Sequence, residues 1–264
     1  MNILRFLVLG VTVLLAQIVA AEIPDTAKNS DVVILGEVHD NPAHHIRQAE
    51  WIAQLQPSAI VFEMLTPDQA AKITSDMLGK PSEIAAAVDW ANSSWPDFSI
   101  YAPIFAAAGQ AAIYGAGLDR NTAMAAAQQT LEDAFGPDAA QFGLTNSLDI
   151  DQQTTRERMQ FEAHCEAMPQ DMMGMMVNIQ RLRDARLADQ ALQAAKDTGG
   201  PVVIITGNGH ARSDWGAPAV LSVASDLTVF ALGQSEDGTQ PRGVFDLVLD
   251  SPGIERPDPC LAFR

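Results

Sequence analysis

The feature that most constrains the fold is a set of short apolar segments in which apolar and polar residues do not alternate. A strand with one face in water alternates, whereas a strand that is apolar throughout is covered on both faces, as in a parallel sheet. The segments are rich in β-branched residues, which favours strands. The predicted strands are Val32–Leu35, Ala59–Phe62, Ala112–Tyr114, Val202–Thr206 and Leu227–Leu232, with Phe245–Leu249 as a late edge strand.

Helical patterns separate these strands. Pro42–Leu55 follows the first strand, and Thr66-Pro67-Asp68-Gln69 is typical of a capped helix start. Residues 149–196 contain no convincing strand and predict a helical insertion or cap, as does Pro81–Trp95. Strands that alternate with helices predict the α/β class, with a three-layer core and a mostly parallel sheet.

Residues 1–21 have the pattern of a secretory signal peptide. A short basic start ending at Arg5 precedes an apolar run, and small residues end at Ala21. The alternative is a membrane anchor, but the run is short for a span of about 20 residues. We expect cleavage near Ala21, leaving 22–264 as one soluble periplasmic α/β domain.

The charge and the cysteines narrow the possible partners. A formal net charge of -17 with no basic run repels nucleic acid and anionic lipid, so we expect no nucleic-acid partner. Cys165 and Cys260 are the two cysteines. An export compartment favours a disulfide between them, whereas a metal-binding or redox pair would normally show CxxC spacing.

Polar side chains follow the predicted strands where each one ends. Two strands end in the pattern Gly-x-x-His, one at Gly36–His39 and one at Gly207–His210. Ligands of open α/β folds bind at the carboxyl ends of parallel strands, so we expect these side chains to meet. The candidates at this edge are Glu37, His39, Glu63, Asp119, Arg120, His210 and Arg212.

Imidazole and carboxylate groups together can hold a divalent metal or act as acid and base. His39 and His210 are therefore candidate metal ligands, with Glu37 and Glu63 beside them. The alternative is a solvated polar rim, in which Arg212 simply pairs with Asp214 and Arg120 with Asp119.

Three further features leave alternatives open. Successive helical residues point about 100° apart, so only one of His44 and His45 is expected to face the site, and either could lie on the surface. Tyr101 follows a helix start, where its hydroxyl could reach solvent or a ligand. The cluster Met172, Met173, Met175 and Met176 predicts a flexible packing face, or a lining for a large flat ligand.

The segment Gly36–Asn41 with His44, His45 and Gln48, together with Gly207–Gly216, resembles the ChaN-type haem-binding lipoproteins of the Tiki/TraB/erythromycin-esterase superfamily. The resemblance implies export, haem or iron handling, and haem held at a homodimer interface with a tyrosine as axial ligand. Tyr101 is the position that would take this role, and His44, His45, Asp119 and Arg120 would help to bind the cofactor. The lipobox cysteine of a lipoprotein is absent.

The same resemblance implies a rival function. Tiki-like relatives are metal-dependent proteases, and erythromycin esterases hydrolyse their substrate with histidine and glutamate. By motif, His39 and His210 would be metal ligands or bases, and Glu37 or Glu63 would assist. Arg120 and Arg212 would steady an oxyanion.

The leading expectation is a periplasmic protein that binds haem or another iron compound and serves its uptake. The first alternative is a metal-dependent hydrolase. A structural or partner-binding envelope protein is a third possibility, disfavoured because the histidines and acids are all present.

Overall fold

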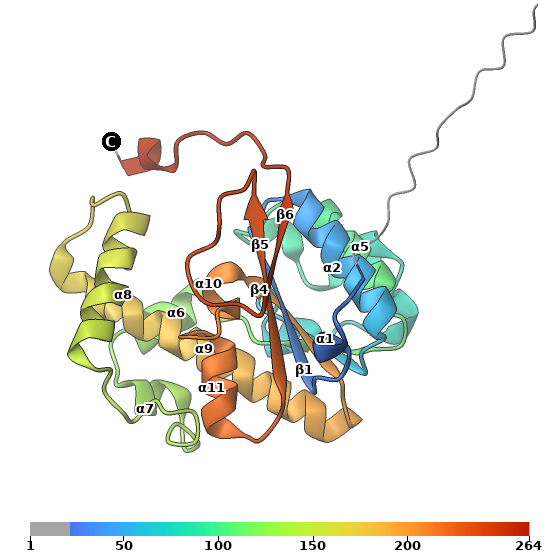
Figure 1. Ribbon diagram of the computed structural model, residues 1–264, viewed down its shortest axis with the longest axis horizontal. Coiled ribbons are helices and arrows are strands. Elements are labelled where there is room, and N and C mark those ends of the chain that lie inside the picture. Colours follow the sequence, from blue (N-terminus) through green and yellow to red (C-terminus); the bar gives the residue numbers. More distant parts are fainter. Residues whose placement is uncertain (1–21, 264) are drawn as a thin grey trace, which may run out of the picture.

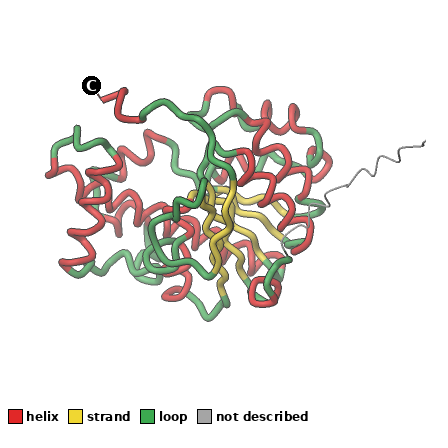
Figure 2. The backbone as a smooth tube through the Cα atoms, turned by 45° about the horizontal axis from the view of Figure 1, so that its top comes forward, coloured by secondary structure: helices red, strands yellow, loops and turns green. Residues whose placement is uncertain are grey.

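The computed structural model describes residues 22–263, so the expected signal peptide at residues 1–21 lies outside the described residues. Within them, six strands form one sheet in the order β3-β2-β4-β1-β5-β6, and every neighbouring pair is parallel. Figures 1 and 2 show this sheet enclosed by helices, which confirms the predicted α/β class. The strands are β1 Val32–Glu37, β2 Ala59–Phe62, β3 Ala112–Gly115, β4 Val202–Gly207, β5 Val229–Glu236 and β6 Leu247–Ser251.

The observed strands match the predicted segments, with small shifts at their ends. β1 and β4 each extend to the residues that begin the polar motifs, Glu37 and Gly207. The predicted late strand is present as β6, which pairs with β5 at the sheet edge. β1 and β4 are buried at every position, as their continuous apolar sequences predict.

One face of the sheet is covered by α2 Pro42–Leu55, α4 Pro81–Ala87 and α5 Phe98–Ala107. Their apolar side chains pack on alternate residues of the strands, such as Val33 and Leu35 of β1. Trp51 of α2 and Phe105 of α5 are among the largest fully buried side chains. α1 Asp25–Lys28 lies before β1, and its Ala27 joins this cluster.

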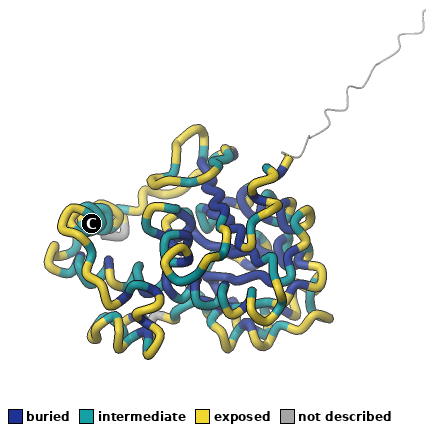
Figure 3. The backbone as a smooth tube through the Cα atoms, turned by 60° about the horizontal axis from the view of Figure 1, so that its bottom comes forward, coloured by how far each residue is buried: buried dark blue, intermediate teal, exposed yellow. Residues whose placement is uncertain are grey.

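The other face is covered by α7 Leu131–Phe135, α9 Met173–Thr198 and α11 Ala217–Ala224. These helices pack on the intervening strand residues, Val32 and Ile34 in β1. Helices on both faces complete the three layers, and Figure 3 shows that the buried backbone lies inside, with more exposed backbone around it. The short elements are α3 Pro67–Ala70, η1 Ser75–Met77, η2 Trp90–Asn92, α6 Arg120–Ala126, α10 Asn208–Ala211 and η4 Pro259–Phe263.

The predicted helical stretch at 149–196 consists of α8 Ile150–Ala163, η3 Gln170–Met172 and α9. Only part of it is an addition to the core. The C-terminal half of α9 buries Ala185, Ala188 and Ala191 against the sheet, so it is a core crossover helix rather than a cap. α8 packs against α9 and lies beside it at the end of the molecule (Figure 1).

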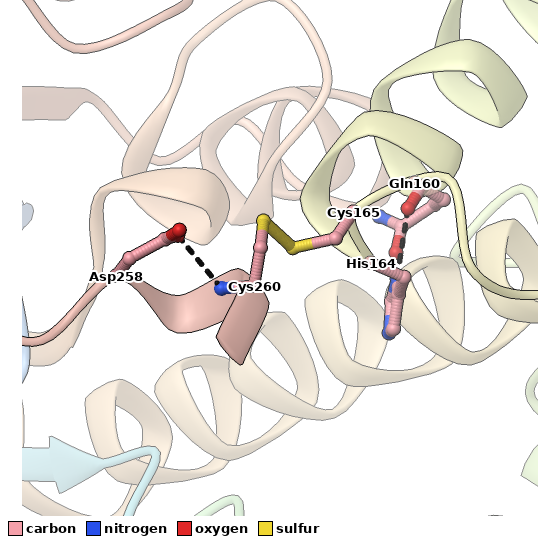
Figure 4. The surroundings of a disulfide bond; sticks show 5 residues. All are labelled: Gln160, His164, Cys165, Asp258 and Cys260. Atoms are coloured by element: carbon pink, nitrogen blue, oxygen red, sulfur yellow. Dashed lines mark hydrogen bonds between the residues drawn. A yellow bond between two sulfur atoms is a disulfide. The ribbon is translucent and has the colours of Figure 1, made fainter. Parts of the chain in front are cut away.

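The predicted disulfide is present. Cys165 and Cys260 are bonded with their Cα atoms 5.5 Å apart, which ties η4 to the turn after α8 (Figure 4). Within residues 22–263, no helix combines the length and the hydropathy that a bilayer crossing requires.

Candidate functional site

The strand order brings the two Gly-x-x-His motifs together. β4 lies between β1 and β2, with Gly207 in register with Glu37 and Ile205 in register with Phe62. Glu63, the first residue after β2, therefore reaches the end of β4. Its Oε2 accepts hydrogen bonds from Thr206 Oγ1 at 2.6 Å and from the Gly207 N–H at 2.9 Å.

The Glu63 carboxylate lies between two imidazoles. His39 Nε2 is 3.9 Å from Glu63 Oε2, and His210 Nε2 is 3.6 Å from Glu63 Oε1. The opposite nitrogen of each ring faces a second acid: His39 Nδ1 lies 2.8 Å from Glu37 Oε1, and His210 Nδ1 lies 2.6 Å from Asp184 Oδ1. The result is a chain of five side chains, Glu37–His39–Glu63–His210–Asp184, which we call the acid–histidine chain.

Gly207 allows this close approach. A Cβ atom built on Gly207 would lie 2.8 Å from His39 Nε2, which is closer than such contacts occur. Because glycine lacks that atom, the His39 ring can lie against the end of β4. Trp95 packs edge-on against the other side of the ring, with centroids 4.9 Å apart.

The Glu37 carboxylate, at one end of the acid–histidine chain, is buried. Gln48 donates to its Oε2 at 2.8 Å, Tyr101 donates to its Oε1 at 3.0 Å, and His45 Nε2 lies 3.2 Å from Oε2. A buried carboxylate with this many donors remains ionised, since hydrogen bonds to the charged form favour it.

Charge and burial compete within the chain. Burial alone would lower the pKa of His39, but its hydrogen bond to Glu37 and the charge of Glu63 outweigh burial and raise the pKa to about 9. Burial is likewise the largest influence on Glu63, yet the charges of His210 and His39 lower its pKa. The charges of Glu63 and Asp184 raise the pKa of His210 despite burial. At neutral pH the chain therefore holds an imidazolium at His39 beside the carboxylate of Glu37.

His44 and His45 are both fully buried, so the alternative that either one lies on the surface is wrong. Nδ1 of His44 accepts a hydrogen bond from the Val38 N–H at 2.9 Å, which holds the loop after β1. Only His45 contacts the acid–histidine chain, through Glu37. Two helical neighbours can both be buried because α2 is covered by the sheet and by α5.

An open cleft of about 1090 Å³ lies above the acid–histidine chain. His39, Glu63 and His210 form part of its surface. The larger apolar residues that line the cleft are Met64, Trp95, Leu118, Met124, Met176 and Ile179. The polar residues that line it include Thr66, Asp68, Gln69, Lys72, Asp89, Asp119, Gln160, His164, Gln180 and Arg183.

The predicted charged residues Arg212 and Asp119 differ in their positions relative to the cleft. Arg212 does not line the cleft: it forms a two-bond ion pair with Asp214, at 2.6 Å for each bond, and its guanidinium lies 3.7 Å from the centre of the Trp215 ring. The alternative of simple pairing describes it better than an oxyanion role. Asp119 does line the cleft, but its carboxylate also caps α6 by accepting from Thr122. Arg120 is the first residue of α6.

Tyr101 is also not on the cleft surface. Its side chain is fully buried, and its hydroxyl donates to Glu37 Oε1 and to the His39 carbonyl. Burial and the neighbouring carboxylate both raise the pKa of the phenol, so it stays neutral. A neutral, enclosed phenol does not suit the predicted role of iron ligand. The helix start at Phe98 correctly predicts α5 but does not show which side of α5 meets the sheet.

Asp184 is the member of the acid–histidine chain that the sequence motifs do not predict. It lies on α9, with Ala188 and Ala191 following at helical spacing on the buried face. A lone acid on an otherwise apolar helix face is the signal that could have identified it. Burial raises the pKa of Asp184, and the charge of His210 opposes that rise.

The predicted metal alternative finds no preformed centre. Among the described residues, no group of three or more histidine, cysteine, aspartate or glutamate side chains is arranged to hold a metal ion. Pairing of each imidazole with carboxylates accounts for the geometry of the chain instead.

Comparison of the whole chain with known proteins identifies a family and solved structures that resemble it. ChaN of Campylobacter jejuni, whose structure is described as showing cofacial haem binding, superposes with a TM-score of 0.65 at 20% identity, covering 84% of this chain and 87% of that one. The type III effector HopBA1, at 11% identity, covers 86% and 89% of the two chains, but its TM-score of 0.43 is too low to support an argument. No curated protein matches. The family model described as haem-binding uptake, Tiki superfamily, ChaN matches residues 23–221, and the chain therefore belongs to the ChaN family.

Proposed function

We propose that this protein binds haem in the cleft and serves haem or iron uptake. The observation that carries the proposal is the match of residues 23–221 to a family defined by haem-binding uptake. When bound, haem supplies an iron that needs axial ligands and a flat apolar macrocycle with two carboxylates.

The cleft has the size and surface that such a ligand needs. Small-molecule sites usually have volumes of about 300–1,000 Å³, and this cleft of about 1090 Å³ lies at the upper limit. Met64, Leu118, Met176 and Ile179 offer flexible apolar contacts for a large flat ring.

Two cationic side chains of the cleft suit the two carboxylates of haem. Arg183 and Lys72 line the cleft, and neither forms an ion pair with any residue in the range 22–263. A chain with a formal net charge of -17 offers many acids, so unpaired cations at a cleft favour an anionic ligand.

Absorbance titration tests the proposal. Hemin added to residues 22–264 should give a saturable shift of the Soret band at micromolar protein, and no shift would contradict haem binding. Arg183→Gln should weaken binding about tenfold, which corresponds to about 1.4 kcal/mol. Arg158→Gln is the matched control: it removes the same charge from an exposed position of α8 outside the cleft, and its affinity should equal that of the wild type.

Export and dimerisation are separate parts of the proposal. A disulfide between Cys165 and Cys260 is consistent with an oxidising compartment such as the periplasm.

An open cleft leaves one face of a flat ligand uncovered, and a second copy of the chain could cover it. Cell fractionation tests the location, and sedimentation with and without hemin tests the dimer: a monomer under both conditions would contradict it.

Acid–base hydrolysis is a second candidate, favoured by the acid–histidine chain. His39 and His210 line the cleft, and each ring is held by a second acid, Glu37 or Asp184. An imidazolium with a raised pKa would serve as a general acid toward a leaving group. Ester and amide substrates should be screened with wild type and His210→Ala. Equal rates for the two proteins would exclude His210 from any activity found.

A further inference from the structure

The helix α8 contributes to the wall of the cleft but is weakly attached to the core. The structure describes all of α8, and none of its 14 residues is buried. α2 has the same length of 14 residues and buries five of them, Trp51 and Ile52 among them. A helix without buried side chains gains little from the hydrophobic effect, so other contacts have to keep α8 in place.

Side-chain contacts connect α8 to the rest of the molecule, besides its packing on α9. Glu162 pairs with Arg242 at 2.7 Å, and both side chains are more than a third exposed. The guanidinium of Arg156 lies 4.7 Å from the centre of the Trp215 ring. Exposed ion pairs contribute little to stability because solvent screens them. α8 can therefore move at a small cost to the core.

The C-terminal segment 252–263, which we call the strap, is fixed at one end to the loop after β1. Arg256 of the strap donates to both carboxylate oxygens of Asp40 and to both of Glu236, at 2.7 Å in each case. Asn41 donates to the backbone at the start of the strap at 3.0 Å. Bidentate pairs of this kind hold an arginine in a defined position.

The other end of the strap is joined covalently to the turn after α8. The disulfide bonds Cys260 of the strap to Cys165, two residues beyond the end of α8 (Figure 4). Figure 1 shows the strap running from β6 to this end of α8. Both cysteines are half-buried and the strap before Cys260 is mostly exposed, so the bond lies within reach of a thiol in solution.

Both attachment points of the strap are close in the chain to residues that line the cleft. Asp40 directly follows His39, which lines the cleft at the end of the sheet. Gln160 of α8 lines the cleft as well, and Cys165 follows one turn of chain later. The strap therefore connects two parts of the cleft wall, and α8 can move away only as far as the strap allows.

We propose that the Cys165–Cys260 disulfide is a redox-sensitive tether of the cleft wall, and that a dithiol reductant which breaks it frees α8 and speeds release of the bound ligand. The inference rests on the proposed haem binding and describes how that site is regulated. It gives the C-terminal strap a function in holding the cleft together.

The exchange with the dithiol balances in atoms and electrons. One thiolate of the dithiol attacks a sulfur of the disulfide and forms a mixed disulfide, and its second thiol then displaces the remaining cysteine. The reductant becomes a cyclic disulfide, and Cys165 and Cys260 become two thiols by gaining two electrons and two protons. Beyond the main chain, α8 is then held by non-covalent contacts.

Hydrogen–deuterium exchange of the ligand-free protein tests the tether without haem. Reduction with dithiothreitol should speed amide exchange in α8 about tenfold and leave that of α2 unchanged, because buried side chains anchor α2. The double variant Cys165→Ser/Cys260→Ser should exchange like reduced wild type, with or without dithiothreitol. Equal exchange of α8 in oxidised and reduced wild type would overturn the tether, whether or not the protein binds haem.

Arg256→Gln tests the strap while the disulfide is intact. It weakens the attachment to Asp40 and Glu236, so exchange in α8 should become faster than in oxidised wild type. An unchanged exchange of α8 in this variant would show that the strap does not restrain the helix.

Gallium protoporphyrin, a fluorescent analogue of haem whose metal keeps its oxidation state, tests the release of the ligand. Wild type that is reduced with dithiothreitol and blocked with iodoacetamide should release it about tenfold faster than oxidised wild type, which corresponds to about 1.4 kcal/mol. The double variant should release it as fast as the blocked protein. Equal rates for oxidised and reduced wild type would overturn the regulation, whereas no binding to either form would contradict haem binding and leave the exchange measurement to decide the tether.

Discussion

Asp184 Oδ1 lies 2.6 Å from Nδ1 of His210, although Asp184 lies on α9 and His210 lies on α10, the short helix that follows β4. The contact directs the opposite nitrogen of His210 toward Glu63. It therefore links the core helix α9 to the chemistry at the sheet edge.

Replacing Asp184 by Asn should lower the free energy of unfolding by about 3 kcal/mol, because the buried ring of His210 loses the carboxylate that its Nδ1 contacts. Urea denaturation measures the change. Asp138→Asn, at an exposed turn position, removes the same charge and should change stability little. Equal stabilities for the two variants would show that the His210–Asp184 contact does not matter to the fold.

The stabilisation that His39 contributes should decrease as the pH rises, because its imidazole loses its proton. The pKa of its imidazole is raised from 6.5 to about 9 in the folded protein, so its contribution is complete below pH 6.5 and disappears as the pH rises through 9. The difference in unfolding free energy between wild type and His39→Gln should therefore shrink from pH 6.5 to pH 9.5. A difference that stays constant over this range would contradict the charged state of His39.

Gly207→Ala should displace the His39 ring, since the new Cβ would meet Nε2 at 2.8 Å. Displacement separates His39 from Glu63, so the pKa of His39 should decrease, as measured by NMR titration of the imidazole. Gly209→Ala is the matched control two residues away, where a Cβ would meet nothing within 4 Å. The same pKa in both variants would mean that the close approach at Gly207 is not needed.

Removing the disulfide by replacing Cys165 and Cys260 with Ser should lower the free energy of unfolding by about 2–4 kcal/mol, because the bond closes a loop of 95 residues. Urea denaturation of the double variant, compared with the oxidised wild type, gives the value. Haem affinity should also decrease, because the segment after α8 loses its anchor. An unchanged stability and an unchanged affinity would argue against any anchoring role.

Much of the fold follows from the sequence because burial of parallel strands requires uninterrupted apolar residues. Val32–Glu37 and Val202–Gly207 show that pattern, and their polar ends predict the meeting of Glu37, His39, Glu63 and His210. Glycines in both motifs point to a close approach, which Gly207 provides.

The positions of the other site residues depend on which face of each helix packs inward. Tyr101 and His44 are enclosed because α2 and α5 pack on each other and on the sheet, a tertiary fact that local pattern does not contain. Arg212 pairs with a neighbour two residues away, so its position after a strand end says nothing about the cleft. Asp184 lies on the helix α9, so the residues that follow the strand ends do not predict its place in the site.

Paramagnetic broadening of methionine methyl signals tests the central claim most directly. Ferric haem in the cleft should broaden the methyl resonances of Met64, Met124 and Met176, which line it. The resonance of Met77, which does not line the cleft, should be broadened less. Broadening of all these signals alike, or of none at saturating hemin, would contradict haem binding in this cleft.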